Sequence, residues 1–322
     1  MNDKAETKQQ AGEGGPKKGL SVGGRTFLAV ALTLVAILGF DIMGVIVKVL
    51  SARGYSAPEL SAYRNVLGML PSLVLILVLG EVKLRREDLI IRQWKMALFR
   101  GVAVAVAQLA FYSALALLEL ASISALAQTN ALFAVIFSVL MFRERVGVWR
   151  IGALLLGFAG VLMVLRPGSD TFTLAALLPI VAAMCYSFSI VTVRIFDDGV
   201  GNPLLYLYSS IASAIGAFGI ALFTGGFSAI AQWQDFALIF TMSMAGGVAV
   251  LLLMIGYRMA PVSILAPFSY LSILTALFFG WLFFDELPVE TLFPGVFFIV
   301  GAGVLILWRE QRARRLATKG IT

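Results

Sequence analysis

A series of ten apolar stretches, each 18–24 residues long, constrains the fold of this chain more than any other feature. A helix of about 20 residues crosses the roughly 30 Å hydrocarbon layer of a bilayer. Only 13% of the residues are charged, and most of these lie between the stretches. The sequence therefore predicts an all-α membrane protein with ten transmembrane helices. The stretches are residues 27–50, 58–80, 97–118, 122–142, 148–165, 172–193, 203–224, 235–256, 262–284 and 291–308.

The distribution of positive charge predicts the orientation. With the N-terminus in the cytoplasm, 21 of the 25 Lys and Arg residues lie on or beside the cytoplasmic side, and the positive-inside rule favours this arrangement. Both termini are then cytoplasmic. Residues 1–25 are rich in Gly, Lys and Gln, which is typical of a disordered tail. Residues 310–322 form a basic cytoplasmic tail.

Several kinds of site are not expected. The chain has no histidine and a single cysteine, Cys185, so neither an imidazole metal site nor an intrachain disulfide is predicted. It also lacks an HExxH sequence, and we predict no enzyme activity and no cofactor. The net charge of +7 lies between membrane spans, and we predict no nucleic-acid partner.

The chain repeats itself at a shift of about 142–146 residues. At a shift of 142, Phe142-Arg143-Glu144 aligns with Phe284-Asp285-Glu286. The repeat units are residues 26–168 and 169–309, with five helices each, and an odd number of crossings makes the second unit enter the membrane from the opposite face. Inverted repeats of this kind are found in many secondary transporters, whose substrate site lies near the midplane between the halves. A channel and a duplicated scaffold without transport activity are the alternatives.

A set of short motifs keeps a characteristic order and spacing over residues 27–308. The motifs are Arg100-Gly101, Tyr112-Ser113-Ala114-Leu115, Arg143-Glu144-Arg145, Gly157-Phe158-Ala159-Gly160-Val161, Arg166-Pro167-Gly168, Ala266-Pro267-Phe268-Ser269-Tyr270, Gly280-Trp281 and Phe284-Asp285-Glu286-Leu287-Pro288. In these the chain resembles EamA-type carriers of the drug/metabolite transporter superfamily, and is most similar to the branch with S-adenosylmethionine and riboflavin uptake carriers. The resemblance implies a carrier of a small organic metabolite, with uptake of a nucleoside- or flavin-like compound favoured over export of amino acids or drugs. It implies no particular coupling ion or oligomeric state.

Features shared by the two halves are interpreted as structural. Some charged residues at helix ends occupy matching positions in the two halves. At a helix end a charged side chain can cap the helix or extend to the membrane–water interface. The matched pairs are Lys48 and Arg194, Glu144 and Glu286, and Arg166 and Arg309. Glycines allow close helix contact in lipid. The glycines so interpreted are Gly152, Gly157, Gly160, Gly295, Gly301 and Gly303.

Polar residues found in only one half are better candidates for substrate binding. Asp41 aligns with Ser187, and Arg64 aligns with Ser209. Asp41 and Arg64 lie at similar depth on consecutive helices. Because buried ions are costly in a membrane, we expect the two to form a salt bridge. This salt bridge would either take part in substrate binding or only stabilise helix packing. Proton coupling, if present, would have to use Asp41 or Glu119.

Further polar residues predict the lining of the site. Gln108 and Tyr112 share one face of the helix at 97–118. Gln128 and Asn130 are about 200° apart on their helix, so one of them is expected to serve packing. The second half offers aromatic and hydroxyl groups, and a mixed lining suits a planar organic solute. The predicted substrate-binding residues are Asp41, Arg64, Gln108, Tyr112, Gln128, Asn130, Tyr186, Tyr270 and Ser272.

Overall fold

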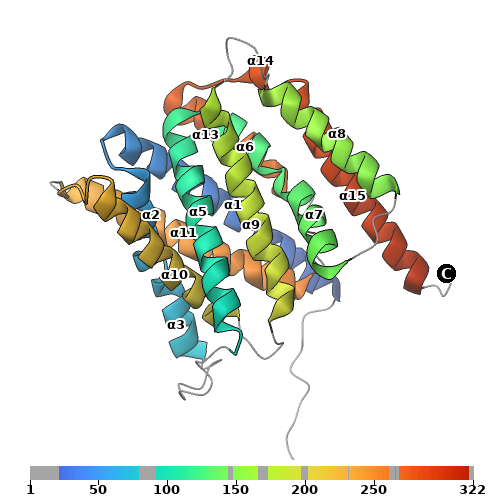
Figure 1. Cartoon of the computed structure of the whole chain (residues 1–322), viewed down its shortest axis with the longest axis horizontal. Coiled ribbons are helices and arrows are strands. Elements are labelled where there is room, and N and C mark those ends of the chain that lie inside the picture. Colours follow the sequence, from blue (N-terminus) through green and yellow to red (C-terminus); the bar gives the residue numbers. More distant parts are fainter. Residues whose placement is uncertain are drawn as a thin grey trace, which may run out of the picture.

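The structure of the protein is a computed structural model that describes residues 22–79, 92–143, 148–165, 173–196, 202–230, 232–260, 265 and 268–318. Within these ranges all regular secondary structure is helical, which confirms the predicted all-α class (Figure 1). The helices are α1 Val22–Ala52, α2 Ala57–Leu67, α3 Leu70–Leu79, α5 Trp94–Leu117, α6 Leu120–Ala127, α7 Asn130–Phe142, α8 Val148–Leu165, η1 Leu174–Leu177, α9 Leu178–Val191, η2 Thr192–Ile195, α10 Asn202–Phe223, α11 Trp233–Met259, α13 Leu271–Phe284, α14 Val289–Leu292 and α15 Gly295–Thr318.

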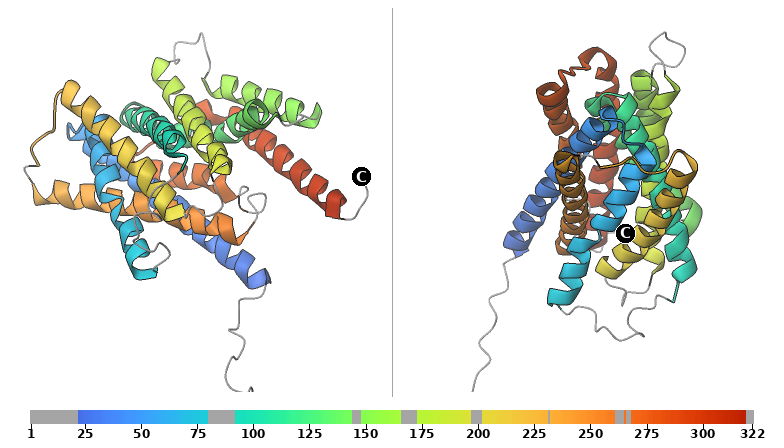
Figure 2. Two further views of the ribbon diagram at one scale, coloured as in Figure 1. Left: turned by 60° about the horizontal axis from the view of Figure 1, so that its bottom comes forward. Right: turned by 90° about the vertical axis from the view of Figure 1, so that its left-hand side faces the viewer.

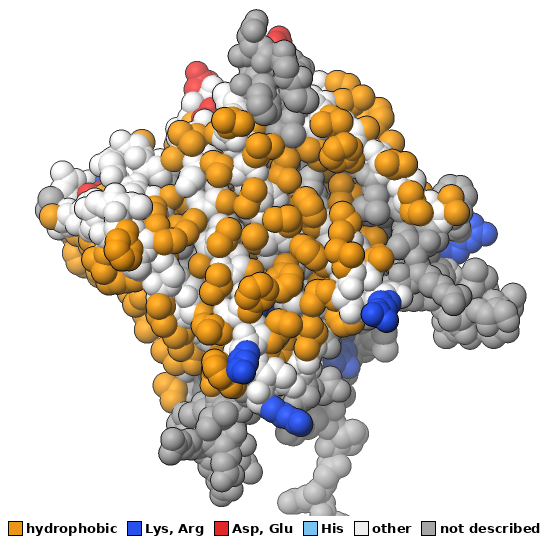
Figure 3. Space-filling view, in the orientation of Figure 1, with side chains coloured by type: hydrophobic (Ala, Val, Ile, Leu, Met, Phe, Trp, Pro, Cys, Tyr) orange, Lys and Arg blue, Asp and Glu red, His pale blue; other side chains and the backbone are white. Residues whose placement is uncertain are grey.

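The outer surface is apolar. Figure 3 shows hydrophobic side chains over most of one face, with Lys and Arg toward the lower edge and Asp and Glu toward the upper and left edges. Trp233 and Phe223 are 76% and 93% exposed, as expected only where lipid replaces water. Six helical segments of the described chain are long and apolar enough to cross a bilayer, and three shorter apolar helices accompany them. The protein is a multi-pass membrane protein.

Two of the predicted stretches contain a helix break. The stretch 58–80 divides into α2 and α3 after Leu67, and the stretch 122–142 divides into α6 and α7 at Gln128 and Thr129. At the first break the Gly68 carbonyl accepts a hydrogen bond from the Tyr206 hydroxyl at 3.2 Å. Gly247 of α11 also lies close, because a Cβ on it would be 2.6 Å from the Gly68 oxygen. Apolar periodicity does not reveal such breaks.

The chain ends differ in part from the prediction. Helix α1 begins at Val22, four residues inside the predicted tail, and the rest of that tail lies outside the described residues. Helix α15 extends through most of the basic tail, to Thr318.

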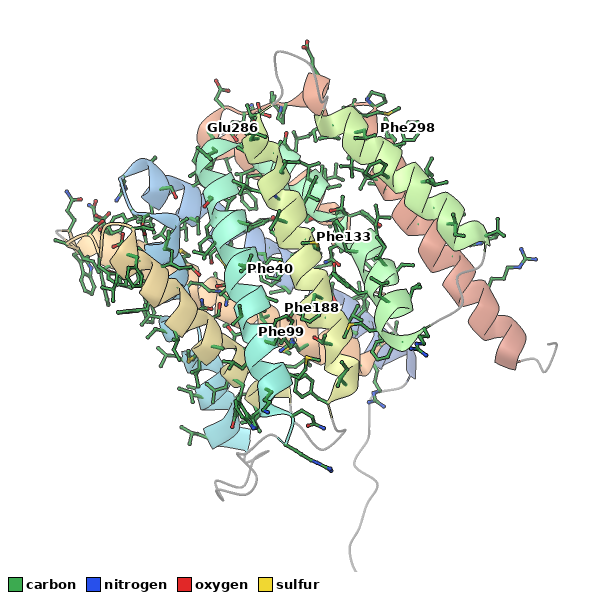
Figure 4. The ribbon with its side chains drawn as sticks, viewed as in Figure 1. Phe40, Phe99, Phe133, Phe188, Glu286 and Phe298 are labelled. Atoms are coloured by element: carbon green, nitrogen blue, oxygen red, sulfur yellow. The ribbon has the colours of Figure 1, made fainter. Side chains whose placement is uncertain are left out.

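The helices pack in pairs that join the two halves of the chain. Helix α1 packs along α11, α5 along α9, α2 against α10, and α8 along α15 (Figures 1 and 2). Phe188 of α9 packs edge-on against Phe99 of α5, with ring centroids 5.4 Å apart (Figure 4). Helix α7 also packs on α9, and α13 packs on α1. The interior is therefore shared between the halves.

Glycines set the closest of these contacts. A Cβ on Gly160 would lie 2.8 Å from the Gly295 oxygen, and a Cβ on Gly295 would lie 2.7 Å from the Gly160 oxygen, so α8 and α15 touch backbone to backbone. The packing interpretation is confirmed there, and also at Gly157 and Gly303. At Gly152 no described residue lies within 4 Å of a Cβ, so the structure gives no packing reason for that glycine.

Candidate functional site

Arg64 is a charged residue buried between the two halves of the chain. It sits in α2, one turn before the break, with only 5% of its surface exposed. Its Nη1 donates to the Asn65 Oδ1 at 3.2 Å, and its Nε has no hydrogen-bond partner. Among the residues that the structure describes, no carboxylate lies within 4.0 Å of this guanidinium.

Five other helices converge on Arg64. The phenol groups of Tyr112 on α5, Tyr186 on α9 and Tyr206 on α10 lie within electrostatic range of it. On its remaining sides Met43 of α1 and Gly246 of α11 approach it, since a Cβ on Gly246 would be 3.2 Å from Arg64 Nε and 2.6 Å from Met43 Sδ. The Tyr112 hydroxyl donates to the same sulfur at 3.6 Å. Two of the predicted tyrosines, Tyr112 and Tyr186, therefore lie near Arg64. The structure adds Tyr206, which the sequence analysis did not name.

The expected salt bridge between Asp41 and Arg64 is not formed. Asp41 Oδ2 instead accepts a hydrogen bond from the Thr275 hydroxyl of α13. Asp41 and Met43 are two residues apart on α1, which is a rotation of about 200° around the helix axis, so their side chains lie on nearly opposite faces. Because Met43 faces Arg64, Asp41 faces away from it. Depth along the helices was predicted from sequence, but their rotation was not.

Gln108 belongs to a buried polar cluster between α2, α5 and α10. Its Oε1 accepts hydrogen bonds from Ser61 Oγ at 2.9 Å, Asn65 Nδ2 at 2.6 Å and Ser213 Oγ at 3.3 Å. Its Nε2 donates to Asn65 Oδ1 at 3.2 Å. All four side chains are at most 2% exposed. The groups of Gln108 are thus largely occupied by protein partners.

The two polar residues at the second helix break also bind neighbouring helices. Gln128 Nε2 donates to the Ser269 carbonyl at 3.2 Å and to Ser272 Oγ at 2.8 Å, where α13 begins. The Ser187 hydroxyl of α9 donates to the Asn130 carbonyl at 2.7 Å and lies 3.2 Å from Asn130 Oδ1. Both residues therefore contribute to contacts between the halves.

Tyr270, the last of the predicted lining residues, rests against α15. A Cβ on Gly303 would lie only 1.2 Å from the Tyr270 hydroxyl oxygen, so the missing side chain of Gly303 makes room for the phenol. Tyr270 is separated in this way from the group around Arg64.

Charged pairs hold the helix ends at the upper edge of the molecule, where Figure 4 labels Glu286. Lys48 forms an ion pair with Glu286 and donates to the Leu118 carbonyl at 2.8 Å. Glu286 also accepts from the Leu120 amide at 3.3 Å. Arg53 pairs with Asp235 in the same way. Glu119, the other predicted proton carrier, accepts from Ser122 Oγ at 3.2 Å. The matched partner Glu144 and also Arg166 lie outside the described residues.

Comparison with known proteins agrees with this all-helical membrane architecture. The profile of the EamA-like transporter family matches residues 27–166. A riboflavin transporter of Rhizobium johnstonii is 30% identical over 224 residues, which cover 68% of this chain and 72% of the relative. The chain belongs to the EamA-like transporter family. The resemblance to the drug/metabolite transporter superfamily is thereby confirmed, and the protein is a membrane transporter with a small-molecule substrate.

Other relatives carry different names. The pseudopaline exporter of Pseudomonas aeruginosa is 26% identical and the match covers 84% of this chain and 93% of the exporter. The S-adenosylmethionine uptake transporter of Rickettsia bellii is 22% identical over 56% of this chain and 62% of its own. One solved crystal structure superposes with a TM-score of 0.64 at 18% identity, covering 88% of this chain and 97% of that one, and it supports the fold alone.

Proposed function

We propose that this EamA-family protein is a secondary transporter that moves a small organic metabolite across a bacterial inner membrane by alternating access. The proposal includes ten crossings in two inverted five-helix repeats, residues 26–168 and 169–309, with both termini in the cytoplasm.

The pairing of the helices supports the inverted repeat. The repeat shift maps α1 onto α9, α5 onto α11 and α7 onto α13. The contact of α1 with α11 then corresponds to that of α9 with α5, and the contact of α1 with α13 corresponds to that of α9 with α7. The C-termini of α7 and α13 are also alike. Each helix is followed by a C-cap residue in the left-handed backbone conformation, Arg143 at φ 52° and Asp285 at φ 55°, and these two residues are 142 positions apart.

Helices that map onto each other meet on the symmetry axis. These are the pairs α2 with α10 and α8 with α15, both of which are in contact. Arg64 lies on α2 with Tyr206 of α10 beside it, which puts the Arg64 group near the axis where transporter sites lie. We therefore propose Arg64, Tyr112, Tyr186 and Tyr206 as the substrate site. Gln108, Gln128, Asn130, Tyr270 and Ser272 hold the surrounding helices.

The aromatic content of this site favours a planar organic solute, since aromatic side chains stack on flat rings. Uptake of a flavin- or nucleoside-like compound is the proposed activity, in keeping with the names of two relatives. Export of an organic compound is the second candidate, because the exporter relative matches over a larger share of both chains. Asp41 and Glu119 remain the proposed groups for proton coupling.

Counterflow in proteoliposomes tests the function. Vesicles loaded with unlabelled riboflavin should transiently accumulate labelled riboflavin, since an alternating carrier exchanges the two pools. Tyr186→Ala should weaken the apparent affinity roughly tenfold, the effect of about 1.4 kcal/mol, while the lipid-exposed Leu155→Ala should not. Absence of counterflow with riboflavin, adenosine and amino acids would contradict the proposal, and a steady conductance would indicate a channel.

A further inference from the structure

The positive charge of Arg64 has no negative partner within salt-bridge distance in the described part of the protein. A guanidinium is always protonated in proteins, and burying it in a membrane interior is costly unless an opposite charge accompanies it. The described groups around Arg64 are an amide, three phenols, a thioether and a glycine. These groups offer dipoles but no negative charge.

Other cations in the described part of the chain are differently placed. Lys48 and Arg53 each have a carboxylate partner. Arg100 is also buried, but its Nε donates to the Ser189 carbonyl at 2.8 Å and its Nη1 to Ser209 Oγ at 2.6 Å. Three buried side-chain atoms of the described residues have no hydrogen-bond partner, and among them Arg64 Nε is the only one that carries part of a positive charge.

Gly246 of α11 lies on the side of this free nitrogen. A Cβ at Gly246 would lie 3.2 Å from Arg64 Nε and 2.6 Å from Met43 Sδ, so α11 can approach the guanidinium this closely only because residue 246 is a glycine. The planar guanidinium presents donors in a fork that matches two oxygens of a carboxylate or phosphate. The helices that surround Arg64 come from both halves, and a group bound there would contact both.

We propose that Arg64 binds an anionic group of the transported solute, a carboxylate or a phosphate. The inference rests on the transport function proposed above and refines its substrate: among solutes with a flat ring, those that carry an anionic group bind more tightly than neutral ones such as riboflavin. The bound anion would supply the charge that the described residues lack, and the tyrosines would contact the ring.

Thermal unfolding of the purified protein with three matched probes tests this inference. Benzoate, phenylphosphate and neutral benzamide share one ring and differ in the charged group. A ligand that binds the folded state raises Tm by mass action. At constant ionic strength, at least one of the two anions should raise Tm and benzamide should raise it much less. Whether benzoate or phenylphosphate gives the larger rise identifies carboxylate or phosphate as the group.

Substitutions at and near Arg64 test whether the rise in Tm caused by the anions comes from binding at this residue. Arg64→Gln should abolish the anion-dependent rise in Tm, and Gly246→Ala should reduce it, because the new methyl group would press against Met43 Sδ and Arg64 Nε and shift the guanidinium. Lys95→Gln, which removes an exposed cation from α5, should leave it intact. If Arg64→Gln does not fold, Arg64→Lys replaces it, and loss of the fork should weaken carboxylate binding more than phosphate binding.

Three results would overturn the inference: equal stabilisation by benzamide, no stabilisation by either anion, or an unchanged anion effect in the Arg64 variant that folds. Counterflow with neutral and anionic solutes separates the two proposals. If neutral and anionic solutes exchange equally well, the transport function holds and the anion site at Arg64 is contradicted. If no solute of a wide panel exchanges, the transport function itself is contradicted.

Discussion

Gln108 shows how a polar residue in a membrane helix can be fully engaged in packing. Three donors converge on its Oε1, and its Nε2 donates to Asn65. We expect Gln108→Leu to lower Tm by several degrees, because Ser61 and Asn65 would lose their acceptor and a buried unsatisfied group costs about 1–3 kcal/mol. Thermal unfolding in detergent measures this.

Leu155→Ala is the control for that substitution, since Leu155 is 66% exposed on the lipid-facing surface. Solute affinity of the folded Gln108→Leu protein should equal that of the wild type. An unchanged Tm together with weaker affinity would show instead that Gln108 contacts the solute, as its position on the helix face first indicated.

For single residues, the sequence identified polar side chains inside apolar stretches but not their interaction partners. Asp41 and Arg64 were expected to pair because their depths agree, yet the rotation of α1 directs Asp41 to Thr275. Tyr206 and Asn65 were missed, although each is a polar residue within an apolar stretch. Which faces of neighbouring helices meet depends on three-dimensional packing, and a single sequence does not report it.

Helix contacts through glycine give a prediction at the scale of elements. A Cβ at Gly160 would approach the backbone of Gly295 and Ile299 to 2.8 Å, and backbone atoms cannot move aside as a flexible side chain can. Gly160→Ala should therefore separate α8 from α15 and destabilise the protein by about 1–3 kcal/mol, the usual cost of overpacking.

Gly152 on the same helix provides the matched control, because no described residue lies within 4 Å of a Cβ there. Gly152→Ala should keep or slightly raise Tm, since alanine favours a helix over glycine by up to about 1 kcal/mol. Equal losses of Tm in the two variants would show that α8 and α15 do not meet at Gly160.

The ion pair of Lys48 and Glu286 connects three elements: α1, the junction of α5 with α6, and the end of α13. Lys48→Met should lower Tm, because Glu286 would remain half-buried without its cation. Lys48→Glu combined with Glu286→Lys should recover part of the loss, although the Leu118 carbonyl would then face a carboxylate. A double variant less stable than both single variants would argue against the pair.

The positions of most helices could be predicted from apolar length alone, since a membrane span needs about 20 apolar residues. The breaks at Gly68 and Gln128 could not. They depend on contacts with other helices, such as the hydrogen bond from Tyr206 to the Gly68 carbonyl. Broken helices next to a polar group are a common feature of transporter sites, and Arg64 lies within one turn of the first break.

For the whole molecule, self-similarity of the sequence was the most informative signal. It paired helices that lie far apart in the chain, and the contacts of α2 with α10 and of α8 with α15 agree with that pairing. In the proposed inverted repeat the central position of Arg64 has the same origin, because elements that map onto each other would meet at the axis. Its free Nε depends on side-chain packing and could not have been read from the repeat.

The proposed inverted arrangement makes a prediction about the two sides of the membrane. In a Cys185→Ser background, which removes the single native cysteine, single cysteines can be introduced at Gly168, Glu87 and Thr322. A membrane-impermeant maleimide should label Gly168→Cys in intact cells, because five crossings bring the end of the first repeat to the outside. It should label Glu87→Cys and Thr322→Cys only after permeabilisation, because two and ten crossings return the chain to the cytoplasm. Labelling of Thr322→Cys but not of Glu87→Cys in intact cells would mean an odd number of crossings between these two positions, whereas the two five-helix repeats require eight, and the pseudo-two-fold site around Arg64 would then lose its basis.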